Sequence, residues 1–278
     1  MRVHFVNEHQ KRQLSRLKNL HAWKKLGKFI SIRVDKYGLL VVVVPIQGSR
    51  CVSVGHGMTN KPSDTQQLWQ IMLESMRQSG IMNTPDVEAA FSAVPRHLFL
   101  PNLAPEDVYV DRAIPLKKDG AGLLTSSSSQ PSVMAIMLNQ LQLQAGDNVL
   151  EIGTASGYNA AIMQYIVGKN GTITSIEIDN ELAHQAQQNL IRAHASRVNV
   201  VNADGVNGYA PRAGYDHIVA TVGVWDVPSA WLMQLKPKGT LVVPIVIDGV
   251  QVSATFKAMS DGTYLSVDNR PCAFVYIL

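Results

Sequence analysis

The chain has 278 residues, of which 46% are apolar and 17% charged, an ordinary globular composition. This length suits one large domain with an appendage, and no apolar run reaches the eighteen residues that a membrane-spanning helix needs. The two cysteines, Cys51 and Cys272, lie far apart without metal-ligand spacing, so we expect a cytoplasmic protein with no zinc or other metal site.

The net charge of +4 is unevenly distributed along the chain. Residues 1–57 carry eleven Lys and Arg against two acidic residues, a net +9, whereas residues 58–278 carry a net −5. A basic arm can bind nucleic acid or an anionic membrane. The segment that opens at Met58 looks like a natural start, however, so we interpret residues 1–57 as a poorly structured extension. The apolar run at residues 39–46 could still pair as a strand.

Helices and loops are predicted for residues 58–128. Apolar side chains recur at helical spacing between Gln66 and Ser79, and again between Pro85 and Val94. Residues 95–101 break the helical pattern, and the segment from there to Ser129 is predicted to be rich in loops. A further helix begins near Pro131, because proline suits the first helical turn.

The most informative stretch begins at Val149 and reads VLEIGTASGY. An apolar run meets Glu151, a turn follows between Gly153 and Gly157, and residues 159–167 suit a helix. A strand, a tight loop and a helix in this order open an α/β domain of the nucleotide-binding type. The glycine spacing alone is weakly specific, because a plain strand–helix unit with a glycine turn has the same pattern.

The residues around this loop indicate which nucleotide-like ligand is bound. The next predicted strand ends in Glu177, whose carboxylate can accept hydrogen bonds from two ribose hydroxyls. The dinucleotide pattern G-x-G-x-x-G is incomplete because Ala155 stands between the glycines, and a pyrophosphate needs bare backbone amides there. Glu151 suits a ligand with a cationic amino group and suits a pyrophosphate poorly. Together these residues favour S-adenosylmethionine over NAD.

The rest of the chain continues the alternation of strands and helices and then changes period. Asp179 can cap a helix, a third strand ends before Asp204 and Gly205, a fourth runs over residues 216–222, and a short helix follows at residues 228–235. Three antiparallel strands are then predicted, at residues 241–246, 252–259 and 272–278. This order predicts an α/β fold with a mainly parallel sheet and an antiparallel C-terminal edge.

Six blocks of sequence occur in the same order as in one known family. They are VPRHLF from Val94, YVDRAIP from Tyr109, SSQP from Ser128, VLEIGTASGY from Val149, Asp204 with Gly205, and LKPKG from Leu235. Together they resemble the protein-L-isoaspartate (D-aspartate) O-methyltransferase family, and especially a bacterial branch that modifies ribosomally made peptides. The resemblance implies a class I, Rossmann-like S-adenosylmethionine-dependent methyltransferase. Its N-terminal helical segment would be residues 58–128, and its cofactor-binding α/β domain residues 129–278.

The resemblance also implies roles for residues in the cofactor site. Gly153 and Gly157 would shape the loop beside the methionine part of the cofactor. Glu177 would hold the ribose, and Asp204 and Gly205 would lie against the adenine. With Glu151, these residues are the predicted cofactor-binding set.

Ser129 matches the serine that precedes Gln-Pro in the family motif, and the resemblance implies that it is the active-site serine. The acceptor would be an aspartyl or isoaspartyl carboxylate in a protein or peptide. Such a carboxylate has a pKa of about 4 and is ionised at neutral pH, so no strong general base is needed. Catalysis is then mostly in-line alignment of oxygen, methyl carbon and sulfur, with Ser129 orienting the acceptor. Repair of damaged proteins and modification of a dedicated peptide are not distinguished.

Three departures from the family pattern affect these expectations. Ala155 replaces a central glycine, Ser127 and Ser128 stand where the family often has Thr-Ile, and the chain stops at Leu278 where many relatives continue. The alternatives that stay open are an S-adenosylmethionine-binding protein without catalysis and a methyltransferase for a different acceptor. An Asn/Asp-Pro-Pro-aromatic signature of nucleic-acid methyltransferases is missing. We therefore expect a monomer with a protein or peptide substrate and with neither nucleic acid nor membrane as partner.

Overall fold

The computed structural model describes residues 31–34, 40–43 and 64–277, except residues 248 and 260. Contacts divide the chain into residues 1–61 and residues 62–278. In the first unit, β1 (Ser31–Val34) pairs antiparallel with β2 (Leu40–Val43), which lies inside the apolar run expected to pair as a strand. The remainder of the predicted basic extension lies outside the described residues. Within the described residues, no helix has the length and apolar character to cross a membrane.

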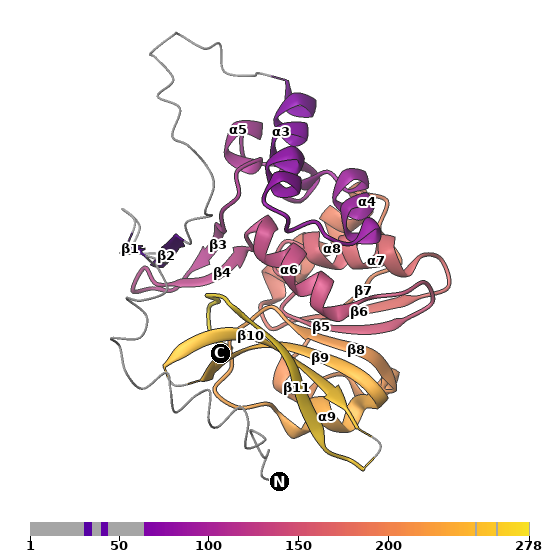
Figure 1. The fold of residues 1–278 in the computed structure, drawn as a ribbon. Coiled ribbons are helices and arrows are strands. Elements are labelled where there is room, and N and C mark those ends of the chain that lie inside the picture. The colour runs from indigo at the N-terminus through magenta and orange to yellow at the C-terminus, as the bar shows by residue number, and fades with distance from the viewer. Residues whose placement is uncertain (1–30, 35–39, 44–63, 248, 260, 278) are drawn as a thin grey trace. The chain divides into compact units, whose positions relative to one another are not determined.

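The larger unit is built on a seven-stranded sheet with the order β11-β10-β9-β8-β5-β6-β7 (Figure 1). The five strands from β9 to β7 run parallel, and β10 and β11 continue the sheet as an antiparallel edge. The predicted α/β class and sheet type are confirmed. The strand bounds are β5 (Asn148–Ile152), β6 (Thr172–Glu177), β7 (Asn199–Asn202), β8 (Tyr215–Ala220), β9 (Leu235–Ile247), β10 (Val250–Ala258) and β11 (Tyr264–Pro271).

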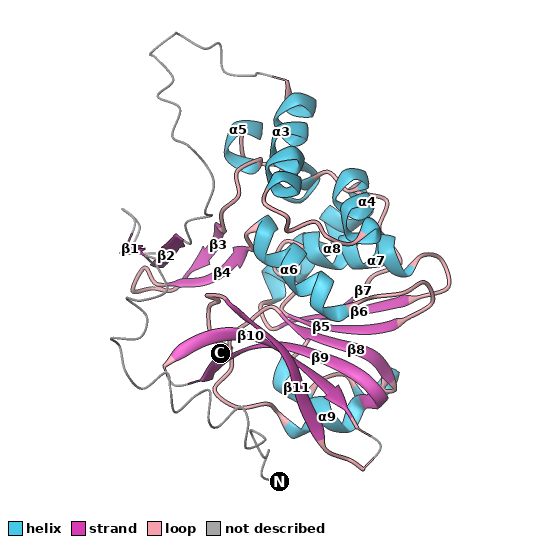
Figure 2. Ribbon diagram, in the orientation of Figure 1, coloured by secondary structure: helices cyan, strands magenta, loops and turns pink. Residues whose placement is uncertain are grey.

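Helices cover both faces of this sheet (Figure 2). Val149 and Leu150 are neighbours on β5 but belong to different hydrophobic clusters, because alternate side chains of a strand point to opposite faces. One cluster includes side chains of α3, α4, α6, α7 and α8, and the other includes Trp231 of α9. The helix bounds are α3 (Thr65–Gln78), α4 (Pro85–Ala93), α6 (Pro131–Leu141), α7 (Tyr158–Val167), α8 (Asn180–Arg192) and α9 (Ser229–Gln234).

Side chains at the helix starts explain several of these bounds. Asp64 accepts a hydrogen bond from the Gln66 amide at 3.0 Å and so caps α3. The predicted cap at Asp179 is present, since its carboxylate accepts from the amides of Glu181 and Leu182 at the start of α8. The cap at Asp179 fixes where the chain turns from strand to helix, and α8 therefore begins directly beyond the carboxyl end of β6.

Two details of this unit go beyond or differ from the sequence prediction. The loop-rich segment at residues 95–129 also contains short regular elements, namely a 3-10 turn (Arg96–Phe99), α5 (Pro105–Val108) and an antiparallel hairpin of β3 (Ile114–Lys118) and β4 (Leu124–Ser128). The hairpin tip is held by Asp119, whose carboxylate accepts from two backbone amides. The last antiparallel strand covers residues 264–271 and not 272–278, because the turn at residues 261–262 leads directly into it.

Candidate active site

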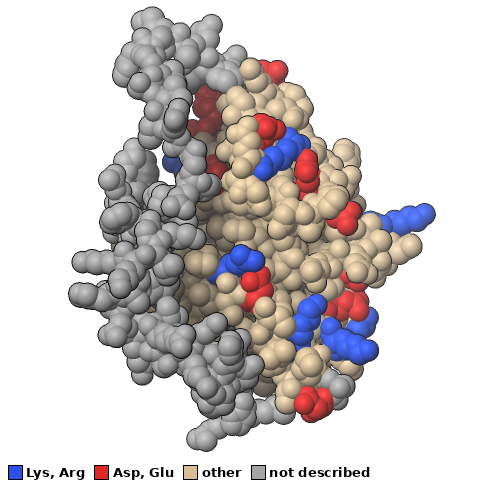
Figure 3. All heavy atoms as spheres, viewed as in Figure 1, with Lys and Arg blue, Asp and Glu red and all other residues tan. Residues whose placement is uncertain are grey.

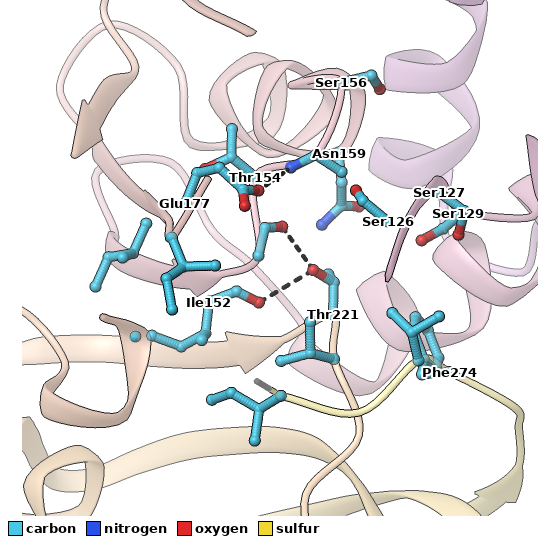
Figure 4. A pocket seen from close by; sticks show the side chains of 18 of the residues that line it. Ser126, Ser127, Ser129, Ile152, Thr154, Ser156, Asn159, Glu177, Thr221 and Phe274 are labelled. Atoms are coloured by element: carbon cyan, nitrogen blue, oxygen red, sulfur yellow. Dashed lines mark hydrogen bonds between the residues drawn. The ribbon is translucent and has the colours of Figure 1, made fainter. Parts of the chain in front are cut away.

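A pocket opens at the carboxyl ends of β5, β6 and β8 (Figure 4). Its walls come from four parts of the chain: β4 with the start of α6, the glycine loop after β5, the residues after β6 to β8, and the segment at residues 274–277. Ligands of open α/β sheets bind at this edge, because the loops that follow parallel strands meet there. The pocket is therefore the candidate cofactor and acceptor site.

The two predicted loop glycines have different structural roles. Gly153 lines the pocket with a φ of 98°, and a Cβ atom there would lie 2.7 Å from Thr221 Oγ1. Gly157 is not among the lining residues. It precedes α7 with a φ of 85°, and a Cβ atom would lie 3.2 Å from Leu190 of α8. Gly153 thus leaves bare backbone at the pocket, and Gly157 permits close packing between the loop and α8.

Ala155, which stands where the family has its central glycine, adopts a φ of 49°. A left-handed backbone costs an L-residue roughly 1–2 kcal/mol, whereas glycine adds about 0.5–1 kcal/mol of unfolded-state entropy. We expect Ala155→Gly to raise the free energy of unfolding by about 0.5 kcal/mol in denaturant titration. The matched control is Ala161→Gly inside α7, which should lower it by about 1 kcal/mol or more. Equal destabilisation by both variants would refute the strain at Ala155.

Glu177 lies at the end of β6 and lines the pocket with 7% of its surface exposed. One carboxylate oxygen accepts from the Ala155 amide at 2.8 Å, and the other accepts from the Asp179 amide at 3.1 Å. Each oxygen can accept a second hydrogen bond. The carboxylate therefore holds the glycine loop in place and can still accept hydrogen bonds from the hydroxyl groups of a ligand.

Glu151 is fully buried and is not among the lining residues. Its carboxyl group accepts hydrogen bonds from the side-chain amide of Asn159 at 2.7 Å and from the Ser175 hydroxyl at 2.5 Å. Asn159 itself lines the pocket. Burial raises the pKa of Glu151 to about 7, against an ordinary value of 4.5. The structure therefore places Glu151 behind the wall, where it positions Asn159.

The raised pKa of Glu151 predicts a pH-dependent stability. Between pH 4.5 and about 7 the carboxyl ionises in the unfolded chain and stays protonated in the folded one, so stability falls as pH rises through this window. The Glu151→Gln variant has no carboxyl group at this position and should not lose stability in this way. We therefore expect the difference in unfolding free energy, variant minus parent, to be larger at pH 8 than at pH 5 by up to roughly 3 kcal/mol. Denaturant titrations at both pH values measure this, and a pH-independent difference would contradict it.

Asp204 and Gly205 both line the pocket after β7. The Asp204 carboxylate accepts from the Val206 amide at 2.9 Å and so begins a short 3-10 turn. A Cβ atom on Gly205 would lie 2.5 Å from Ile152, and the Gly205 carbonyl accepts from the Trp231 indole at 2.8 Å. Only glycine lets this backbone approach β5 so closely.

Ser129 lines the pocket between β4 and α6. Figure 4 shows it on the side opposite Glu177, with Thr221 and Phe274 in the lower part of the same view. Ser126 and Ser127 lie on the same side as Ser129. The site therefore presents a carboxylate on one side and serine hydroxyls on the other, an arrangement that can hold two different ligands in one pocket.

Arg96 is a residue of the site whose role the sequence did not predict. Its fully buried guanidinium donates to five backbone carbonyls, those of Val108, Val110, Arg112, Ser128 and Ser129, at 2.9 to 3.3 Å. Burial lowers the pKa of Arg96 to about 10, so the group stays cationic at neutral pH. Arg96 thus anchors the loop that carries Ser129. The signal in the sequence was that Arg96 stands in the VPRHLF block, between two prolines and beside apolar residues.

Two other parts of the wall were not predicted. The Thr221 hydroxyl donates to the carbonyls of Ile152 and Gly153, at 3.1 and 2.6 Å, and so joins β8 to the glycine loop. Residues 274–277 return from the sheet edge to the pocket, where the Gly223 amide donates to Val275 and the Ile277 amide donates to Gly223. The acceptors in both contacts are backbone carbonyls, which leave no sequence pattern.

Comparisons with known proteins agree with this geometry. The family described as protein-L-isoaspartate(D-aspartate) O-methyltransferase matches residues 67–278. The protein-L-isoaspartate O-methyltransferase of Pyrococcus abyssi is 37% identical over 182 residues, which are 66% of this chain and 81% of the relative. That of Methanopyrus kandleri is 35% identical over 208 residues, 74% of this chain and 89% of the relative.

Two solved structures are also similar. One named protein-L-isoaspartate O-methyltransferase is 33% identical with a TM-score of 0.62, and the match covers 76% of this chain and 66% of that one. A Plasmodium falciparum protein, named a putative protein-L-isoaspartate O-methyltransferase in complex with S-adenosyl-L-homocysteine, is 19% identical with a TM-score of 0.65. That match covers 75% of this chain and 97% of the other, and at this identity it shows a shared fold.

Proposed function

The chain belongs to the protein-L-isoaspartate(D-aspartate) O-methyltransferase family, and on that premise we propose how its pocket performs the reaction. Members of this family use S-adenosylmethionine to methylate carboxyl groups of isoaspartyl residues, and this chain is such a carboxyl O-methyltransferase. The observation that carries the proposal is the placement of Glu177 and Ser129 on opposite sides of one pocket.

The lining residues suit S-adenosylmethionine chemically. Carboxylates at Glu177 and Asp204 can accept from ribose hydroxyls and from the adenine amine, and both are in the wall. Gly153 and Gly205 leave bare backbone, and Ile152 supplies apolar contact for a flat base. We assign the methionine end of the cofactor to the glycine loop, where Gly157 acts through packing.

Ser129 is assigned to the acceptor. An isoaspartyl carboxylate is ionised at neutral pH, so one oxygen can attack while Ser129 donates a hydrogen bond to the other. S-adenosylmethionine supplies a methyl group activated by its sulfonium. The carboxylate oxygen would form its bond to the methyl carbon as the carbon–sulfur bond breaks, and the electron pair of that bond would stay on sulfur. The negative charge of the carboxylate and the positive charge of the sulfonium would thus cancel, which leaves a neutral ester and a neutral thioether, so no proton needs to move. Arg96 holds the Ser129 carbonyl and thereby fixes the hydroxyl at the wall.

Ser129→Ala is the test of this assignment. We expect turnover of an isoaspartyl peptide to fall by about 10- to 100-fold, the loss of one oriented hydrogen bond, while the Kd of S-adenosylmethionine changes by less than about threefold. Radiolabelled cofactor and calorimetry measure the two quantities, and Ser127→Ala on the same wall is the matched control. The label should be released as volatile methanol by base, because the product is a methyl ester. A base-stable label would place the methyl group on nitrogen or nucleic acid and refute the acceptor class.

Narrower properties are proposed with it. We place the enzyme in the cytoplasm as a monomer without a nucleic-acid or membrane partner. On the face in Figure 3, acidic and basic side chains of the described residues are interspersed, which supports the absence of a nucleic-acid or anionic membrane surface there. The methyltransferase segment is proposed to comprise residues 58–128 and 129–278, with residues 1–57 outside it, and the family match beginning at residue 67 supports that division. We also propose that the enzyme repairs damaged proteins that contain isoaspartyl residues. If it methylates a dedicated peptide and no isoaspartyl peptide, its role is peptide modification instead of repair.

A further inference from the structure

Two aromatic side chains form an exposed stack beside the pocket. The rings of Trp225 and Tyr276 lie 4.7 Å apart between centroids, with planes only 2° from parallel. Trp225 is 69% exposed and Tyr276 is 41% exposed. One face of the indole covers Tyr276, and an exposed fraction this large leaves the other face open to solvent. Exposed aromatic pairs of this kind are typical of binding surfaces.

The stack is mounted on fixed backbone. Gly223 donates to Val275 at 2.7 Å and accepts from Ile277 at 2.9 Å, so the residues that carry the two rings are paired on both sides of Tyr276. Val224, next to Trp225, is 1% exposed and its amide donates to Pro244 of β9 at 2.8 Å. The rings are therefore positioned before any ligand arrives, which reduces the entropy that binding costs.

The stack is continuous with the acceptor pocket. Tyr276 and Phe274 line the same pocket as Ser129, and Trp225 extends the surface outward from Tyr276. A peptide whose isoaspartyl side chain reaches Ser129 must carry its neighbouring residues across the pocket rim. A flat side chain on one of those neighbours can therefore lie on the open face of Trp225.

We propose that the Trp225–Tyr276 stack is an acceptor subsite that binds an arginine flanking the isoaspartyl residue, a proposal that rests on the proposed function of the pocket. Asp226 follows Trp225, is exposed, and makes no ion pair with any residue that the structure describes. One of its oxygens accepts from the Val227 amide at 2.8 Å. A guanidinium stacks on an indole and pairs with a carboxylate at once, and an ammonium does this less well.

The test compares peptides that differ only at the residue beside isoaspartate: Arg, Ala, Phe or Glu. The full chain, saturated with S-adenosylhomocysteine, should bind the Arg peptide about tenfold more tightly than the Ala peptide by fluorescence anisotropy. Trp225→Ala should abolish that preference and leave the Ala peptide within about twofold of its original Kd. Trp225→Phe should keep part of the preference, and Asp226→Asn should reduce it.

Several results would overturn the subsite. These are equal binding of the Arg and Ala peptides by the parent protein, a preference that survives Trp225→Ala, and tighter binding of the Phe or Glu peptide. The proposed function is tested separately by turnover of the same peptides. If the Arg peptide is preferred in binding but no peptide is methylated, the acceptor assignment is refuted and the subsite stands. If the peptides are methylated but the Arg peptide is not preferred, the subsite is refuted and the acceptor assignment stands.

Discussion

Glu177→Ala is expected to weaken S-adenosylmethionine binding by roughly 10²-fold or more. Two hydrogen bonds from ribose hydroxyls to a carboxylate are lost, each worth about 1.5–3 kcal/mol. The substitution also removes the acceptor of the Ala155 and Asp179 amides, so the glycine loop loses its attachment to the end of β6. Isothermal titration calorimetry gives the change in Kd, and a melting curve of the free protein shows whether the fold is kept.

Two variants separate these contributions. Glu177→Gln keeps the shape and one carbonyl acceptor, so its Kd should lie between those of the parent and the alanine variant. Glu181→Ala, four residues further on and outside the pocket lining, is the matched control and should bind as the parent does. An alanine variant at position 177 that is folded and binds with unchanged affinity would remove Glu177 from the cofactor site.

Arg96→Met is expected to lower the free energy of unfolding by about 3–5 kcal/mol, because five carbonyls lose a buried cationic donor. For a chain of this size the melting temperature should fall by roughly 10 °C. Arg96→Lys keeps the charge but cannot span all five carbonyls, so its melting temperature should be intermediate. A methionine variant that melts within two degrees of the parent (about 0.5 kcal/mol) would show that the carbonyls are satisfied in another way.

The strands of the parallel sheet could be predicted because burial on two faces produces apolar runs. β5 and β6 fall where such runs were recognised, with acidic residues at or near their carboxyl ends. The hairpin of β3 and β4 gave no such signal, since β4 reads LTSSS. Its conformation depends on backbone pairing, on the turn at Asp119, and on an ion pair between Lys117 and Asp179. β11 was misplaced because it is an edge strand in which polar residues interrupt the apolar ones, as its sequence YLSVDNRP shows.

The cofactor side of the site was more predictable than the acceptor side. Gly153 and Glu177 are close in sequence to the strands that position them, and both line the pocket. Glu151 shows the limit of this reasoning, because the sequence does not distinguish a carboxyl group that lines the pocket from one that is buried behind the lining residues. The partners of Arg96 lie 12 to 33 residues away and are carbonyl groups, which every residue type has. Contacts of this kind become visible only in three dimensions.

The guanidinium of Arg96 ties together chain segments that a small protein would otherwise join with a disulfide. Its hydrogen bonds close loops of 12 to 33 residues, and closing such loops removes conformational freedom that the unfolded chain retains. Unlike a disulfide, this set of hydrogen bonds is not broken by thiols or changed by oxidants. The wall that presents Ser129 therefore keeps its shape whatever the redox state of its surroundings, and it forms and opens with the rest of the fold.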